Sequence, residues 1–102
     1  MKIWMGVLID HDGDPHLFGS SSEDEMYRSL WDTKLQPLLM ECHCDSYVGF
    51  ECGNHGATLE ERRNWPTSLG IKAACLKYLR DLDPDLRWES KDVNVRTPRR
   101  SI

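Results

Sequence analysis

Two short apolar segments separated by a turn sequence begin the chain and constrain its fold most strongly. Residues 3–9 read IWMGVLI, and residues 16–18 (HLF) follow a polar stretch from Asp10 to Pro15. Asp12-Gly13 within that stretch is a preferred pair for a tight turn that needs positive φ. We therefore expect a β-hairpin. Because residues 3–9 are apolar at both odd and even positions, this strand should be central in a small sheet and covered on both faces.

A first helix is predicted after the hairpin. Ser22 and Glu25 form a capping box, and the residues between them give the helix an acidic first turn. Pro37 lacks a backbone N–H, so the helix should end or bend near Leu35. Apolar residues at helical spacing are Met26, Tyr27, Leu30, Trp31 and Leu35.

Residues 68–82 give the clearest helical pattern in the chain. Their apolar residues follow the i, i+3, i+4, i+7 series without a gap, which predicts one buried stripe. Cys75 lies on this stripe and is expected to be a core residue rather than a metal ligand. Thr58 and Glu61 suggest a second capping box, but Pro66 restricts that helix to a short piece. The stripe comprises Ile71, Ala74, Cys75, Tyr78, Leu79 and Leu82.

A C-terminal strand completes the predicted elements. Leu86 and Trp88 occupy even positions whereas Val93 and Val95 occupy odd positions, so a regular strand would point the two apolar pairs to opposite faces. We therefore expect an irregularity near Ser90. The fold class predicted is α+β: a small antiparallel sheet, made of the N-terminal hairpin and this strand, with two main helices on one face. With 102 residues, 39% apolar and 29% charged, the chain is expected to form one two-layer domain over residues 1–95, followed by a basic tail, 96–102.

Several functional classes are disfavoured by the sequence. No apolar run has the roughly 18 to 20 residues that cross a bilayer, and residues 3–9 are too short for a secretory signal, so we expect a cytoplasmic protein without membrane contact. The sequence contains no G-x-S-x-G, phosphate-binding loop, H-E-x-x-H or dinucleotide motif. We therefore expect no catalytic activity.

The segment 38–57 is rich in cysteine and histidine. Cys42, Cys44, Cys52 and His55 have the spacing C-x1-C-x7-C-x2-H and could hold a structural zinc ion, with His43 as a substitute ligand. The C-x1-C half is tighter than usual. Free thiols remain an alternative in a reducing cytosol, and a disulfide from Cys52 to Cys42 or Cys44 would need an oxidising compartment.

Another metal pattern lies in the hairpin turn. Asp10, Asp12 and Asp14 alternate as in a calcium-binding loop, and two histidines, His11 and His16, flank the same turn. Pro15 occupies the position where an EF-hand loop has glycine. The simple turn is therefore the favoured interpretation.

The charge is divided unevenly along the chain. Residues 1–61 hold 12 acidic and 3 basic residues, a net charge of -9, whereas residues 62–102 hold 5 acidic and 10 basic residues, a net charge of +5. Trp65 follows two arginines in a break between helices and is the best candidate for an exposed binding anchor, the alternative being a tryptophan at the edge of the core. The predicted partner-binding residues are Arg62, Arg63, Trp65, Arg96, Arg99 and Arg100.

These features favour a small intracellular interaction protein without chemistry of its own. It would bind a protein or nucleoprotein partner through a charged surface, as small acidic inhibitors and immunity-type proteins do; the likeness is one of composition only. The first alternative is a zinc-stabilised nucleic-acid-binding module that uses the basic residues, which the overall charge of -4 disfavours. The second alternative is a small metal-dependent enzyme built around Cys42 to His55.

Overall fold

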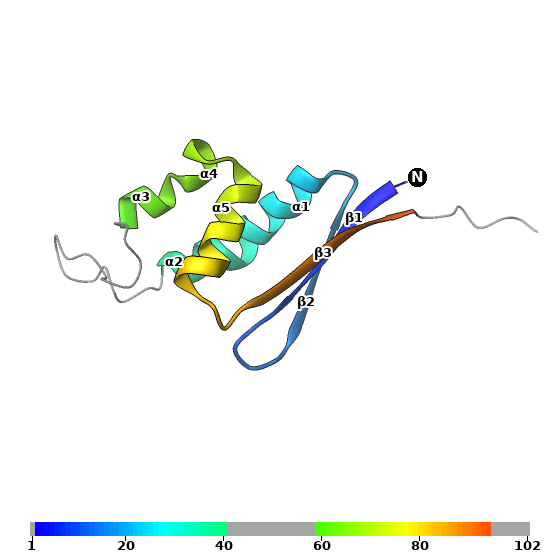
Figure 1. Cartoon of the computed structure of the whole chain (residues 1–102), viewed down its shortest axis with the longest axis horizontal. Helices are drawn as coiled ribbons and strands as arrows, with labels where there is room; N and C mark the ends of the chain where they lie inside the picture. Colours follow the sequence, from blue (N-terminus) through cyan, green and yellow to red (C-terminus); the bar gives the residue numbers. More distant parts are fainter. Residues whose placement is uncertain (1, 41–58, 95–102) are drawn as a thin grey trace, which may run out of the picture.

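The computed structural model describes residues 2–40 and 59–94. Three antiparallel strands, β1 (Lys2–Ile9), β2 (Pro15–Ser20) and β3 (Arg87–Asn94), form a sheet in the order β2-β1-β3. The helices lie together on one side of this sheet (Figure 1). The predicted α+β class is confirmed.

The N-terminal hairpin forms as predicted. Gly13 has a φ of 86°, and its amide donates to the Asp10 carbonyl over 3.0 Å. The Asp10 carboxylate also accepts the amides of Asp12 and Asp14, each at 2.9 Å. The turn therefore satisfies its own backbone groups, and only its glycine needs a left-handed conformation.

Strand β1 is central, but helices cover only one of its faces among the described residues. Leu8 and Phe18 point toward the helices and are 1% and 9% exposed. Met5 and Leu17 point the other way and are 39% and 74% exposed. The expectation of cover on both faces is therefore wrong: the odd-numbered side chains of β1 face away from the helix layer.

Strand β3 is regular. Its pairing with β1 runs without interruption from Lys2 opposite Asn94 to Ile9 opposite Arg87, so the predicted irregularity near Ser90 is wrong. The apolar residues change from even to odd positions because they lie on opposite faces of the sheet. Trp88 contacts the helix layer, and Val93 lies on the opposite face of the sheet.

The first helix continues past its proline. It comprises α1 (Glu23–Leu30), a π-helical segment η1 (Trp31–Leu35) and α2 (Gln36–Met40). The Ser22 hydroxyl caps the start by accepting the Glu25 amide over 3.1 Å. In η1, whose turn is wider than that of an α-helix, the Gln36 amide donates to the Trp31 carbonyl, five residues back. The helix therefore continues past Pro37 and does not end at Leu35.

The second half of the helix layer consists of shorter pieces. These are α3 (Leu59–Arg63), α4 (Trp65–Ser68), α5 (Ile71–Lys77) and a second π-helical segment, η3 (Tyr78–Leu82). Gly70 has a φ of 92°, which separates α4 from α5 and moves the start of the long helix from the predicted residue 68 to Ile71. The short helix α3 agrees with the limit set by Pro66, whereas Thr58 lies outside the described residues.

The core lies between the sheet and the helices. The predicted stripe of α5 and η3 is confirmed, with Ala74 and Cys75 fully buried. In the described part of the chain, no helix is both long and apolar enough to span a membrane. The core residues are Leu8, Phe18, Met26, Tyr27, Leu30, Trp31, Leu35, Leu39, Trp65, Ala74, Cys75, Tyr78, Leu79 and Leu86.

Candidate functional site

The predicted zinc ligands Cys42, Cys44, Cys52 and His55 lie outside the described residues. Zinc binding therefore stays a prediction. Cys75 is a buried core residue, as expected, and its thiol donates to the Tyr27 carbonyl over 3.3 Å. Burial raises the pKa of this thiol to about 12, which leaves it unreactive near neutral pH.

The predicted partner-binding residues do not form one exposed patch among the described residues. Arg63 is exposed, but Arg62 is 0% exposed and Trp65 is 6% exposed. Trp65 is not an exposed anchor but a core residue, in agreement with the alternative interpretation, because its ring joins the core and the Lys77 ammonium lies 5.5 Å from the ring centroid. The tail arginines Arg96, Arg99 and Arg100 lie outside the described residues, so binding by this set stays a prediction.

The acidic and basic halves of the chain meet in the folded structure. Lys72 of α5 pairs with Glu23 of α1 over 3.0 Å, and the Glu23 contact raises the pKa of the Lys72 ammonium. Lys2 of β1 pairs with Asp92 of β3 over 3.2 Å, which lowers the pKa of the Asp92 carboxyl. These pairs join the two halves, so charge along the sequence does not translate directly into two separate faces.

A histidine–carboxylate cluster connects the hairpin turn to the segment before β3. The His11 Nε2 atom lies 3.0 Å from both Asp83 carboxylate oxygens, and this contact raises the His11 pKa. The His16 Nε2 atom lies 2.8 Å from Asp10, and this hydrogen bond, with two backbone amides, lowers the Asp10 pKa. The cluster ties the turn to the helix layer by side-chain contacts.

Two groups in this region have ligand atoms close enough together to surround a cation. One contains His11, Asp83 and Asp85, and the other contains the turn residues Asp10, Asp12 and Asp14; within each group the ligand atoms lie within 4.8 Å of one another. Most of these side chains are exposed. The His11–Asp83 contact, together with the turn's own hydrogen bonds, accounts for the arrangement without a cation.

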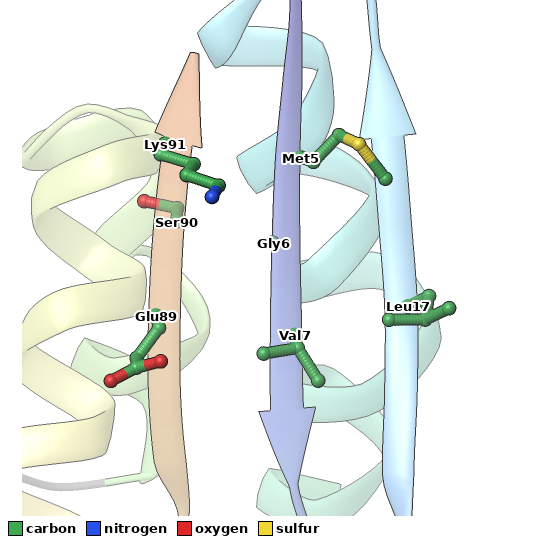
Figure 2. A pocket seen from close by; sticks show the side chains of 7 residues that line it. All are labelled: Met5, Gly6, Val7, Leu17, Glu89, Ser90 and Lys91. Atoms are coloured by element: carbon green, nitrogen blue, oxygen red, sulfur yellow. The ribbon is translucent and has the colours of Figure 1, made fainter. Parts of the chain in front are cut away.

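The open face of the sheet, defined as the face of β1, β2 and β3 opposite the helices, contains a shallow hollow of about 490 Å³. Figure 2 looks onto this face with the helices behind the sheet. Met5 and Val7 project from the central strand, and Leu17 projects from β2. On β3, Glu89 and Lys91 border the apolar centre.

At the middle of the hollow, no side chain projects from its floor. Gly6 is paired with Phe18 on one side and Ser90 on the other. Ser90 and Phe18 direct their side chains toward the helices, where Ser90 Oγ lies 3.1 Å from the Tyr27 hydroxyl and Phe18 joins the core. Backbone atoms alone are therefore left at the centre of the open face.

Aromatic contacts beneath the floor hold this arrangement in place. The Trp88 ring contacts Tyr27 with centroids 5.6 Å apart and Phe18 with centroids 6.0 Å apart. Its Nε1 donates to the Tyr27 hydroxyl over 3.2 Å. The indole lies so close to Gly6 that a Cβ there would approach it to 2.1 Å. Glycine at this position therefore lets the sheet and the aromatic group come together.

Two opposite charges border the hollow two residues apart on β3. Glu89 lies opposite Val7 and Lys91 lies opposite Met5, both cross-strand neighbours being apolar. Within the part of the chain that the structure describes, neither Glu89 nor Lys91 forms an ion pair. Both are exposed and available to a group that approaches the open face.

Sequence reasoning did not identify this face, although a signal was present. The apolar residues of β1 at odd positions require burial or a partner, and we assigned them to a second covering layer. Within residues 2–40 and 59–94, the helices all lie on the other face of the sheet, so no such layer is present there.

Comparison with protein-family models, curated proteins and solved structures found no match for this chain.

Proposed function

We propose that this protein acts by binding another protein, without catalysing a reaction, and that it binds through the open face of the sheet. The observation that carries the proposal is the exposure of apolar side chains at the centre of that face. Leu17 is 74% exposed and Met5 is 39% exposed. Leu17 lies beside Val7 on the adjacent strand, and Met5 lies two residues farther along the strand of Val7 (Figure 2). Contiguous exposed apolar surface with a polar border is typical of protein interaction sites.

The composition of the face favours a protein over a nucleic acid. On this face β3 carries the acidic Glu89 between the basic Arg87 and Lys91, so the charges are mixed and do not form a concentration of positive charge for phosphates. A protein surface that carries apolar side chains and charges of both signs can complement both the apolar centre and the charged border. The binding surface proposed here thus differs from the arginine and tryptophan set expected from the sequence.

Photo-crosslinking in the cells from which the sequence comes tests the proposal. A photoreactive amino acid replaces Leu17 on the open face, and in a matched control it replaces Leu69, which is 45% exposed on the helix side. We expect one discrete product from position 17, absent from position 69 and abolished by the additional substitution Val7→Asp. No product at position 17, or the same products at both positions, would contradict the proposal.

A further inference from the structure

We infer that the partner of the open face is a second copy of this chain, bound face to face about a two-fold axis. This inference rests on the proposed function and specifies its partner. The axis lies in the interface, perpendicular to the strands, and passes over the level of Gly6 and Ser90. Each strand of one copy then faces the same strand of the other copy in the reverse direction.

Charge complementarity leads to this arrangement. Here a level is a row of residues paired across the strands. Glu89 is paired with Val7, one residue along the strands from the Gly6 level, and Lys91 is paired with Met5, one residue from that level in the other direction. A two-fold axis at Gly6 exchanges these levels. It therefore places Glu89 of each copy against Lys91 of the other, giving two ion pairs for groups that have no ion pair among the described residues.

The apolar residues fit the same axis. Met5 and Val7 exchange places, so each packs against the other across the interface. Leu17 lies at the level of Val7 and Gly19 at the level of Met5 on β2. The axis therefore sets the exposed Leu17 of one copy over Gly19 of the other, where no side chain obstructs it.

Axes at the neighbouring levels Val7 and Met5 bring like charges together, whereas an axis at Leu8 pairs Glu89 with Arg87 but leaves Met5 and Lys91 facing positions beyond the ends of β1 and β3 in the other copy. An axis at the level of Val7 places Glu89 against Glu89 of the second copy and Lys91 against Arg87. An axis at the level of Met5 places Lys91 against Lys91. Like-charge contacts in an interface are strongly unfavourable, so they disfavour these registers. The Gly6 axis also lies near the middle of β1 and β3 and uses the whole open face.

An axis along the strands is disfavoured as well. It sets β2 of one copy over β3 of the other, which brings the apolar Leu17 against Glu89 and leaves Lys91 over Gly19. The ion pairs are then lost. Of the axes compared, only the perpendicular axis at Gly6 pairs Glu89 with Lys91 and Met5 with Val7, and it sets Arg87, at the end of β3, over Val93. Sheets packed face to face with nearly aligned strands are a common arrangement.

Charge reversal tests the inference on the full chain, with sedimentation equilibrium as the measurement. The unaltered chain should dimerise. Glu89→Lys and Lys91→Glu should each be monomeric at concentrations where the unaltered chain is a dimer, because each creates two like-charge contacts. An equimolar mixture of the two variants, and the double variant Glu89→Lys/Lys91→Glu, should recover the dimer, because opposite charges face each other again.

Arg63→Glu provides the matched control. It reverses an exposed charge of α3, in the basic group predicted from the sequence, and should leave the dimer unchanged. Circular dichroism of every variant checks that the fold is retained. Dimers that persist in both single variants, or that dissociate with Arg63→Glu, would overturn the inference.

The outcomes separate this inference from the proposed function. A crosslinked product from position 17 with twice the mass of the chain supports both. A product of another mass, with an unaltered chain that stays monomeric at every concentration, refutes self-association while leaving the open face as a binding surface for a different protein. A monomeric chain without any crosslinked product refutes both.

Discussion

Substitution of Gly6 by alanine tests the close contact beneath the open face. The φ of Gly6 is not positive, so the backbone itself accepts alanine. The obstacle is the indole of Trp88, because a Cβ at residue 6 would lie 2.1 Å from Cη2 and 2.5 Å from Cζ2. Carbon atoms in favourable contact are about 3.5 to 4.0 Å apart, so the ring must move by about 1.4 Å or the strands must separate.

The expected cost follows from what fixes the ring. Trp88 contacts Tyr27 and Phe18 and donates to the Tyr27 hydroxyl, so it cannot shift without weakening these contacts. Overpacking costs about 1 to 3 kcal/mol, and an aromatic pair contributes roughly 0.5 to 1.5 kcal/mol. Gly6→Ala should therefore lower the free energy of unfolding by about 2 to 4 kcal/mol, measured by urea denaturation.

Two further variants make the result specific. Gly19→Ala is the control, because the nearest heavy atom to a Cβ there is the Trp4 carbonyl oxygen at 3.8 Å. At dilutions that favour the monomer, its stability should stay equal or rise by up to about 1 kcal/mol. In a Trp88→Phe background, which lacks the outer indole ring, Gly6→Ala should cost at least about 1 kcal/mol less. Equal costs in both backgrounds would refute the assignment of the clash to Trp88.

Three other predictions concern the capping of α1, the buried thiol and the hairpin contact. Ser22→Ala should lower the free energy of unfolding by about 1 kcal/mol through loss of the cap, whereas Ser21→Ala should have little effect; thermal denaturation measures both. Cys75 should resist alkylation at neutral pH in the folded protein and react after unfolding, as read by peptide mass spectrometry, and equal rates in the two states would contradict its burial. NMR titration should give His11 a pKa above its ordinary value of 6.5, returning toward it in Asp83→Asn. Because the folded pKa is raised, this contact stabilises the fold fully below about pH 6.5 and is lost as the pH rises through the folded value; a His11 pKa insensitive to Asp83→Asn would contradict the contact.

The elements that depend on local chemistry were predictable from the sequence. Asp12-Gly13 specified the turn, Ser22 specified the start of α1, and the stripe ending at Leu82 specified the buried side of the long helix. These signals act over a few residues, so no tertiary information is needed to recognise them. The α+β class followed from the order of the elements.

The features that depend on tertiary contacts were not predictable. Pro37 interrupts a normal α-helix, and only the wider turn before it allows the helix to continue. Trp65 has the neighbours of an exposed anchor, yet it is buried because α4 packs into the core. Which face of the sheet stays open also depends on tertiary contacts. Because β1 is apolar at both odd and even positions, its sequence does not indicate which face the helices cover.

Methionine footprinting by hydroxyl radicals tests the central claim that the open face binds a second copy of the chain. Three methionines report on different places: Met5 on the open face is 39% exposed, Met40 on α2 is 51% exposed, and Met26 in the core is 0% exposed. In the dilute chain, Met5 and Met40 should be oxidised and Met26 protected. At high concentration, where the chain is assembled, Met5 should become protected while Met40 does not change. Protection of Met5 already in the dilute monomer, or oxidation of Met5 that is the same in the assembled state, would contradict the account.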